Sequence, residues 1–387
     1  MNTIYTFWWW CRKTTDYLTT LTDIRSNNSP KTMRICLVNP TRRIRRPISE
    51  LAHELLDREH DVGILTPEGR TGYHHEDYLD NATIHKYQAW DAPGSYEFPI
   101  PKNFHATLRS IEDDYNIFHS WTNFYISSLL LAWEQPDSHV VTLDTIPGES
   151  FTMNWCLNAA FWLYNRTIGR WTLTRATKTT VYSDELTPYL RQTGFQDDVS
   201  VTPTGVIEPT VEETPDLPDD YVAFIGLITE RKGIDRVLTV AQSMPDTAFL
   251  VAGDSPERHE WMERAPPNVE FLGQITYVPA LLDQARCLLL PSRGEGLPGV
   301  VMEAMAMRCP VVASNIPCIP DLIPDDDHGF LIDEDNIDGY TDAINTCKDK
   351  QTVQELTVNA YKRVRDRFSW ATATQRFIDV YNDTLES

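Results

Sequence analysis

The sequence predicts an α/β protein of two domains, each built around a parallel sheet. With 387 residues, the chain is long for one hydrophobic core and suits two. Apolar strand patterns alternate with helical patterns in both halves, and this order favours parallel sheets. Between the halves, residues 207–220 are rich in proline and acid and offer little to bury. This segment is therefore predicted to be the linker between the domains.

The first domain is predicted to span residues 33–206. Met33–Val38 is typical of a buried first strand, and Ile48, Leu51 and Leu55 then share one face of a helix. Further strands are predicted at 62–65, 117–119, 140–144, 180–183 and 199–203. The stretch 66–113 shows no clear periodicity and yields no prediction.

The second domain is predicted to span residues 221–369. Gly233 opens a helix between the first two strands, and the tail from Val353 is helical with a break near Ser369. The predicted strands lie at 221–226, 248–253, 269–273, 287–290 and 311–314.

Residues 1–32 do not fit the strand and helix pattern of the two domains and are interpreted as an N-terminal addition to them. They are aromatic at first and then polar, whereas Met33 is a natural beginning for a first strand. We expect a poorly structured extension. It is either the product of a start codon assigned too far upstream or a weak interfacial anchor, and the first interpretation is favoured.

Composition and charge exclude some functions and favour others. A formal net charge of -22 argues against nucleic acid as a partner. Acidic residues are abundant and lysine is scarce, which is typical of a surface adapted to concentrated salt. A halophilic archaeal source is therefore expected.

Cysteine usage and hydropathy indicate the compartment. The seven cysteines form no CxxC pair and no metal-ligand spacing, so they are predicted to be buried thiols of a reducing compartment, with no metal bound. No run approaches the ~20 apolar residues of a membrane span. We therefore expect a cytoplasmic protein.

One segment leaves two interpretations open. Residues 151–173 combine tryptophans and other aromatic residues with arginines. Such a helix could lie on the inner face of the cell membrane, because tryptophan and arginine favour interfaces. Alternatively, it is a helix that faces the core.

Several side chains of the first domain follow strand ends, where open α/β sheets bind ligands. Arg42, Arg43, Arg45 and Arg46 lie in the loop after the first strand, which usually receives phosphates, and Arg42 and Arg43 are the candidate cleft residues. Their guanidinium groups could bind a diphosphate, or they could be solvated surface. His119 and Asp144 follow two other strands and are expected to point into the same cleft.

The stretch 291–306 is the strongest candidate site. A buried strand ends at Pro291, two glycines make a turn that carries Glu295, and an apolar helix carries Glu303. A carboxylate among apolar residues is costly to bury without hydrogen bonds. The stretch therefore indicates a ligand cradle, with a surface loop and a solvated glutamate as the alternative.

Six segments, in order, resemble the second domain of family-4 retaining glycosyltransferases. The similarity is strong over residues 221–331 and weaker in the first domain, at 33–38, His119 and 203–206. The resemblance implies the GT-B architecture, in which two Rossmann-like domains face a central cleft and a last helix, here about 370–387, packs back onto the first domain. The segments are 224–226, 232–235, 251–254, 268–273, 291–306 and 310–314.

The resemblance also implies roles for individual residues. Glu303 would accept hydrogen bonds from both ribose hydroxyls of a nucleotide-sugar, an acceptor-only task that suits a carboxylate. Glu295 would lie near the donor sugar, and Lys232 would neutralise the leaving diphosphate. Catalysis would rest on Lys232 and Glu295, with retention and without an obligatory metal or a cofactor. The implied donor-binding set is Glu303, Arg231, Gly226, Gly253, Gly273, Gly296 and Leu297.

The chain departs from the family pattern at several positions. Leu227 stands where many relatives have arginine, Asp144 stands where they often have histidine, and Pro298 removes an amide donor. An arginine loop replaces the usual glycine-rich first loop.

The leading hypothesis is the transfer of a hexose-type sugar from a nucleotide-sugar to a glycan, a glycolipid or a lipid carrier. The alternatives are a catalytically inactive nucleotide-sugar-binding scaffold and a nucleotide-sugar epimerase that shares the GT-B architecture.

Overall fold

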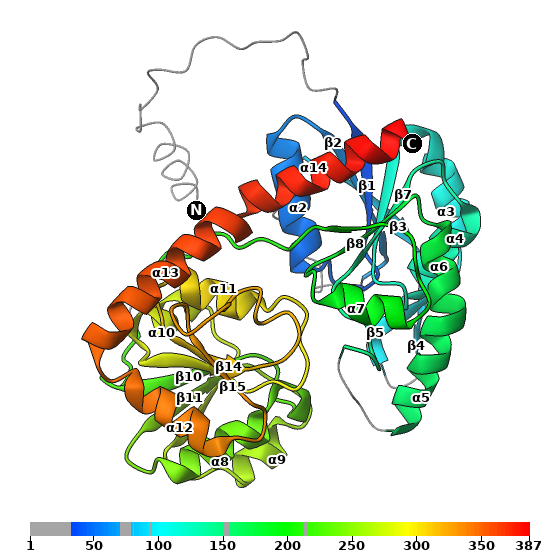
Figure 1. Ribbon diagram of the computed structural model, residues 1–387. Helices are drawn as coiled ribbons and strands as arrows, with labels where there is room; N and C mark the ends of the chain where they lie inside the picture. Colours follow the sequence, from blue (N-terminus) through cyan, green and yellow to red (C-terminus); the bar gives the residue numbers. More distant parts are fainter. Residues whose placement is uncertain (1–31, 70–78, 80, 93–94, 151–154, 213–214) are drawn as a thin grey trace, which may run out of the picture. The chain divides into compact units, whose positions relative to one another are not determined.

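The computed structural model describes residues 32–69, 79, 81–92, 95–150, 155–212 and 215–387 (Figure 1). Met33–Ser387 form one compact unit. The predicted extension, residues 1–32, lies outside the described residues except for Thr32.

The first sheet has seven parallel strands in the order β3-β2-β1-β6-β7-β8-β9. Its central strands are mostly apolar, and all of their residues except Arg34 are buried, as expected where helices cover both faces of a parallel sheet. The strands are β1 (Arg34–Val38), β2 (Asp61–Pro67), β3 (Thr83–Tyr87), β6 (Ile117–Trp121), β7 (His139–Leu143), β8 (Lys178–Val181) and β9 (Val199–Val201).

Helix α2 (Arg46–Asp57) connects β1 to β2 and places the arginine loop at the carboxyl end of β1. Pro47 lies in its first turn, where the missing amide costs no hydrogen bond. Its buried face consists of Ile48, Leu51, Ala52 and Leu55. The other helices of this half are α3 (Phe104–Ile111), α4 (Ile126–Glu134), α5 (Trp155–Tyr164), α6 (Arg170–Arg175) and α7 (Leu186–Gln192), and a π-helix, Asn165–Gly169, joins α5 to α6.

The stretch 66–113, which yields no prediction from the sequence, contains strand β3, helix α3 and an antiparallel pair. The pair is β4 (Ala89–Ala92) with β5 (Ser95–Pro101), and it lies outside the main sheet.

The second sheet has six parallel strands in the order β12-β11-β10-β13-β14-β15. The strands are β10 (Tyr221–Ile225), β11 (Ala248–Ala252), β12 (Val269–Gly273), β13 (Cys287–Leu290), β14 (Val311–Ser314) and β15 (Phe330–Ile332). The helices around it are α8 (Ile234–Ser243), α9 (Arg258–Glu263), α10 (Val278–Gln284), α11 (Gly299–Ala306) and α12 (Ile337–Thr346). The α/β class and the two parallel sheets are thus confirmed.

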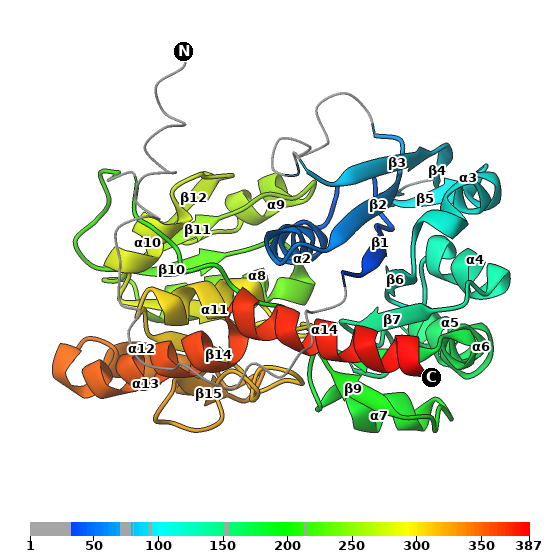
Figure 2. The same ribbon diagram turned by 90° about the horizontal axis from the view of Figure 1, so that it is seen from above.

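The chain ends in two long helices, α13 (Lys350–Phe368) and α14 (Trp370–Glu386) (Figure 2). Ser369 has an extended backbone between them, and its hydroxyl accepts a hydrogen bond from the amide of Thr372. The predicted break is therefore a helix N-cap.

Helix α14 lies against the first sheet, where it contacts α2 and β7. At its start, Gly205 lies so close to Trp370 that an added Cβ would sit 2.7 Å from that residue. Near its end, the Tyr381 hydroxyl bonds to His119 of β6. Among the described helices, none is long and apolar enough to cross a membrane.

Candidate functional site

The turn after β13 carries a nearly buried ion pair. The ammonium of Lys232 donates to both carboxylate oxygens of Glu295, at 2.7 and 2.6 Å. The Ser292 hydroxyl donates to the same carboxylate at 2.6 Å. The Glu295 side chain is only 5% exposed, and that of Lys232 is 16% exposed. Three hydrogen bonds therefore offset the cost of removing this carboxylate from water.

Backbone geometry brings Lys232 to this turn. Lys232 ends the short 3-10 helix Glu230–Lys232, and Gly233 follows in the left-handed region at φ 79°. A side chain on Gly233 would overlap the carbonyl of Pro291. Only glycine permits both this conformation and this contact between the two loops.

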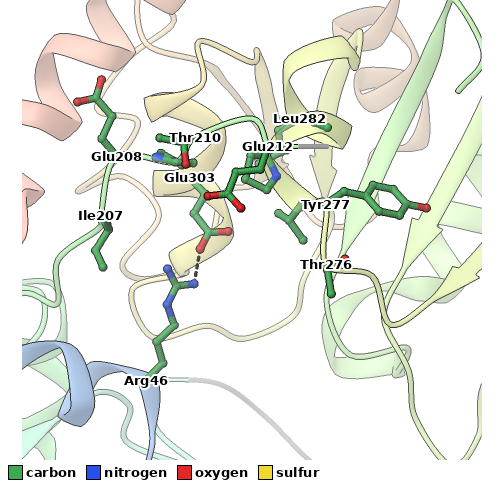
Figure 3. Close-up of a pocket in the computed structure, with 13 residues that line it drawn as sticks. Arg46, Ile207, Glu208, Thr210, Glu212, Thr276, Tyr277, Leu282 and Glu303 are labelled. Carbon is green, nitrogen blue, oxygen red and sulfur yellow. Dashed lines mark hydrogen bonds and ion pairs between the residues drawn. The ribbon is translucent and has the colours of Figure 1, made fainter. Parts of the chain in front are cut away.

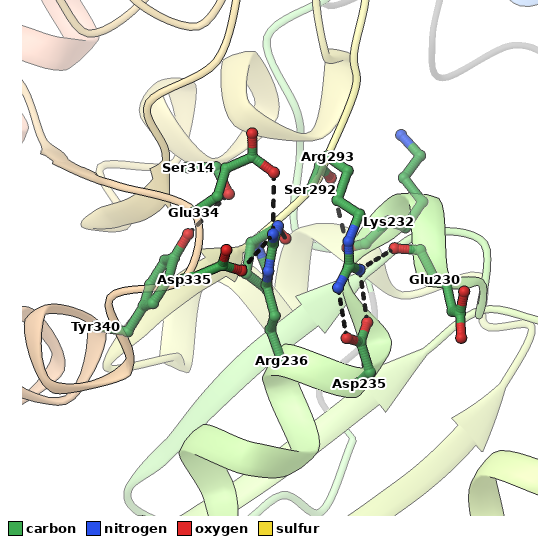
Figure 4. A network of polar contacts seen from close by, with 11 residues as sticks. Glu230, Lys232, Asp235, Arg236, Ser292, Arg293, Ser314, Glu334, Asp335 and Tyr340 are labelled. Atoms are coloured by element: carbon green, nitrogen blue, oxygen red, sulfur yellow. Dashed lines mark hydrogen bonds and ion pairs between the residues drawn. The ribbon is translucent and has the colours of Figure 1, made fainter. Parts of the chain in front are cut away.

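A polar network locks the same two loops together (Figure 4). Arg293 donates to both oxygens of Asp235 at 2.7 and 2.6 Å, a bidentate geometry that resists rotation. Burial acts to raise the pKa of Asp235, but Arg293 outweighs this effect and lowers the pKa overall. Arg231 donates to the carbonyl of Gly294 at 2.7 Å. The network therefore stabilises the turn that presents Glu295.

Glu303 projects from α11, whose other side chains include the buried Val301, Met302, Ala304 and Met305. Its carboxylate accepts a hydrogen bond from Arg46 at the start of α2 (Figure 3). Arg46 also pairs with Glu50 at 2.6 Å, and Glu50 accepts from the indole of Trp370. Burial raises the pKa of Glu50, while Arg46 opposes that shift. Glu303 is thus hydrogen-bonded rather than freely solvated.

A cavity of about 440 Å³ joins these groups to the first sheet. The charged residues that line it are Arg45, Arg46, Glu50, Asp144, Arg231, Lys232, Glu295 and Glu303. A second cavity, of about 460 Å³, shares Arg46 and Glu303 with the first and extends to Tyr277 and the linker residues Glu208 and Glu212 (Figure 3). The Arg46–Glu303 pair therefore stands where the two cavities meet.

Asp144 lies in the first cavity, and its side chain pairs with Arg45 at 2.6 Å. A Cβ added to Gly296 would lie 2.7 Å from the Asp144 carbonyl oxygen. The loop after β7 therefore lies directly against the Glu295 turn, and the absent side chain at Gly296 permits this approach.

The expectation that His119 points into the same cleft is wrong. Its side chain is fully buried, between the hydroxyls of Tyr381 and Thr142, each 2.6 Å from a ring nitrogen. Burial lowers the pKa of His119 well below its ordinary value. His119 therefore connects β6 to α14 as a neutral core residue.

The arginine loop contributes to the first cavity through two of its four arginines, Arg45 and Arg46, and not through the candidate cleft residues Arg42 and Arg43. Arg42 pairs with Asp91 at 2.8 Å, and neither Arg42 nor Arg43 lines the cavity. Arg45 and Arg46 line it because α2 begins there and its first turn faces the second half of the chain. The sequence indicated these arginines only as part of the basic loop. The residue at which α2 begins decides which arginines of that loop face the cavity.

Gly226, Gly253 and Gly273 do not line the cavity either. The Gly253 amide donates to the Gly273 carbonyl at 2.8 Å, and a side chain on Gly253 would overlap the Gly226 carbonyl. These glycines allow the loops after β10, β11 and β12 to pack closely. Leu227, which directly follows Gly226, is 51% exposed.

The described residues contain no group of three or more His, Cys, Asp or Glu side chains that could hold a metal ion. The arrangement instead offers fixed cations beside a half-open cavity, with carboxylates that can accept hydrogen bonds from hydroxyl groups. Such a site can bind a polyhydroxylated ligand with a negatively charged group.

Comparisons with known proteins identify the class. Residues 46–208 match the model of Glycosyltransferase Family 4, and residues 219–349 match that of Glycosyl transferases group 1. The chain resembles the structure of Anabaena Alr3699/HepE in complex with UDP-glucose, with a TM-score of 0.73, 17% identity, and coverage of 91% of this chain and 100% of that one. Sucrose-phosphate synthase from Thermosynechococcus elongatus gives a TM-score of 0.72 at 19% identity, over 92% and 99% of the two chains. The fold is therefore GT-B.

A curated relative extends the match over most of the chain. The phosphatidyl-myo-inositol mannosyltransferase of Mycolicibacterium smegmatis is 25% identical over 86% of this chain and 88% of its own. The alpha-maltose-1-phosphate synthase of the same organism is 27% identical over 43% of this chain. The chain spans about half the length of this relative, and half or less of the length of others. The protein belongs to the family-4 GT-B glycosyltransferases.

Proposed function

We propose that the protein transfers a hexose-type sugar from a nucleotide-sugar, with retention of configuration and without a metal. The observation that carries this proposal is the cavity in which Lys232, Glu295 and Glu303 meet Arg45, Arg46 and Asp144. Cations and hydrogen-bonding carboxylates at one cavity suit the two ends of a sugar diphosphate. The UDP-glucose complex of a structural relative supports this donor class.

Glu303 would accept hydrogen bonds from the ribose hydroxyls. It lies on helix α11, and its present partner, Arg46, has a largely exposed side chain (59%), whereas Glu303 itself is 14% exposed. The ribose hydroxyls would replace or share the hydrogen bond that Arg46 now donates, while Arg46 keeps its pair with Glu50.

Lys232 would stabilise the diphosphate as the bond to the sugar breaks. An ammonium has three donors, and Glu295 takes two of them. The third is left for a phosphate oxygen. Glu295 would hold Lys232 in place and lie beside the donor sugar, while Arg231, Gly296 and Leu297 complete this side of the cavity.

The acceptor is proposed to be a glycan or lipid-linked hydroxyl, reached from the cytoplasm by a protein peripheral to the membrane. The name of the phosphatidyl-myo-inositol mannosyltransferase supports a lipid-borne acceptor, and the aromatic segment 155–173 supports a membrane contact.

The decisive test incubates the full chain with UDP-, GDP- or ADP-sugars, with and without a lipid-phosphate or glycan acceptor. We expect free nucleoside diphosphate only when the acceptor is present. NMR of the anomeric proton in the product then reports retention or inversion.

The same experiment separates the alternatives. An inactive scaffold would bind nucleotide-sugars without releasing diphosphate under any condition. An epimerase would produce free sugar or a new nucleotide-sugar without acceptor. Either result would refute the proposed transfer.

A further inference from the structure

The aromatic helix of the first half exposes its apolar side chains. None of the residues of α5, all of them described, is buried, so the interpretation of this helix as core-facing is wrong. Trp155 is 81% exposed, the highest value among the exposed large apolar side chains of the described residues. The other exposed apolar side chains of α5 and the π-helix are Leu157, Trp162, Leu163 and Ile168.

The patch continues beyond this segment onto α4. Trp133 is 70% exposed, and its ring lies 6.0 Å from that of Trp171 on α6. Helices α4 and α6 pack against each other (Figure 1). We call the surface formed by Trp133, Trp155, Leu157, Trp162, Leu163, Ile168 and Trp171 the aromatic ridge.

Polar contacts help to hold the ridge in place, together with ring contacts of Phe161 and the buried Leu173. The Asn165 side chain donates to the Pro147 carbonyl at 2.9 Å, and the Tyr164 hydroxyl donates to the Asn123 carbonyl at 2.6 Å. Gly169 is buried in the π-helix, close to the Asn123 side chain. The helix is therefore anchored on one side while its large apolar side chains face outward, an arrangement typical of an interaction surface.

The charge of the ridge identifies the kind of partner. The chain has 56 acidic and 34 basic residues, yet it has no Asp or Glu from Trp155 to Ser183 and has four cations there, Arg166, Arg170, Arg175 and Lys178. Two of these cations lie over ridge tryptophans: Arg166, which also pairs with Glu149, is 4.5 Å from the Trp162 ring, and Arg175 is 5.2 Å from the Trp171 ring. In a symmetric dimer of two ridges, arginines would face arginines, whereas an anionic lipid surface complements both the apolar side chains and the cations.

We infer that the aromatic ridge docks the protein onto a bilayer that contains anionic phospholipids. Tryptophan and leucine would enter the boundary between headgroups and acyl chains, and the arginines would contact lipid phosphates. The inference deepens the proposed function, because a membrane-borne acceptor gives the ridge its purpose. Docking itself requires no donor and no transfer, so the two proposals can fail separately.

The two parts of this interaction respond differently to salt. At 1 M salt the Debye length is about 3 Å, so attraction between arginine and anionic lipid weakens strongly. Insertion of apolar side chains is not screened. We therefore expect the preference for anionic lipid to fall at high salt while a basal, tryptophan-dependent binding remains.

The test is co-sedimentation of the full chain, without donor, with vesicles of phosphatidylcholine alone or mixed with phosphatidylglycerol. We expect roughly tenfold or greater preference for the anionic vesicles in low salt. The double variant Trp155→Ser/Trp162→Ser should lose about tenfold or more of the binding to both vesicle types.

Matched variants control for changes in general surface properties. Leu163→Ser should weaken binding, whereas Leu385→Ser, on an exposed leucine of α14 (40% exposed), should not. Arg175→Gln should reduce the preference for anionic vesicles, whereas Arg264→Gln should not, although Arg264 also lies over a tryptophan, Trp261, at 4.5 Å. Urea unfolding verifies that each variant is folded.

Three results would overturn the inference. The first is equal binding by the wild type and Trp155→Ser/Trp162→Ser. The second is an equal loss in the Leu385→Ser control. The third is that the wild type binds no vesicles but forms a dimer in analytical ultracentrifugation, and that Trp155→Ser/Trp162→Ser abolishes this dimer. The ridge would then be an interface between copies of the chain.

Discussion

The Lys232–Glu295 pair is predicted to support both the fold and the reaction, and a double-mutant cycle separates the two contributions. Lys232→Met keeps the length of the side chain and removes its charge. Glu295, 5% exposed, then retains only the hydroxyl of Ser292 among its side-chain donors, at 2.6 Å. Breaking a buried pair by removing one partner costs about 3–5 kcal/mol. Because Ser292 remains, we expect a value near the lower end, about 3 kcal/mol.

The reverse substitution is expected to cost less. Glu295→Gln keeps a hydrogen-bond acceptor for Ser292, and Lys232, at 16% exposure, can turn its ammonium toward water. We expect a loss of about 1–3 kcal/mol. In the double variant neither charge is left unpaired, so its loss should be smaller than the sum of the single losses by about 1.5–3 kcal/mol.

Urea unfolding monitored by circular dichroism measures the stability of the four proteins. Turnover is measured at a temperature at which all four are folded. Lys232→Met should lower kcat by about 10²-fold or more, because the leaving diphosphate loses a preorganised donor, and it should change donor affinity less. Unchanged stability in Lys232→Met would refute the burial argument. Unchanged turnover would refute the catalytic role.

Four further predictions concern the donor site, the buried histidines, metal independence and the acidic surface. Glu303→Ala should weaken binding of nucleoside and nucleoside diphosphate by tenfold or more, because hydrogen bonds to a charged group contribute about 1.5–3 kcal/mol. Arg46→Met should leave nucleoside binding equal or tighter, because Arg46 then no longer competes with the ribose for the Glu303 carboxylate. A large loss of affinity in Arg46→Met, measured by calorimetry, would reverse this assignment. Burial lowers the pKa of His119 and brings that of His139 to about 3, so on acidification the unfolded chain binds these protons before the folded chain does. The free energy of unfolding should be at its full value above pH 6.5 and should fall below it by about 1.4 kcal/mol per pH unit for each histidine. His119→Gln should lack the contribution of one histidine to this slope, and a pH-independent difference in stability between the two proteins would contradict the assignment. A chelator should leave the rate of sugar transfer unchanged. If the acidic surface is adapted to salt, the free energy of unfolding should be lower in dilute buffer than in concentrated salt. Full stability without salt would argue against that adaptation.

The sequence predicted the fold well where hydrophobic patterns were strong. The strands predicted in both sheets are mostly apolar runs, and the break near Ser369 was predicted from the interruption of the helical pattern. The pair β4–β5 was missed because short, partly exposed strands lack a clear alternation of apolar and polar residues. Strand β15 was missed for a similar reason, since Phe330–Ile332 has three residues and none is fully buried.

Prediction of the site succeeded within one local segment and failed across distant ones. Glu295 and Glu303 share a strand–turn–helix unit, so their proximity follows from local geometry. The contact between Arg46 and Glu303 joins residues that are 257 positions apart, and no local pattern indicates it. His119 shows the same limit, because its burial depends on Tyr381 at the other end of the chain.

The return of α14 to the first sheet has a consequence for the order in which the protein is made. All strands of the first sheet have been synthesised once Val201 is added, yet Trp370 and Tyr381, which cover α2 and His119, come last. At 5–20 residues per second, the intervening chain takes about 10–40 s to synthesise. During this interval the first half displays an apolar face that only the final helix covers, so the domain that is translated first is the last to be completed.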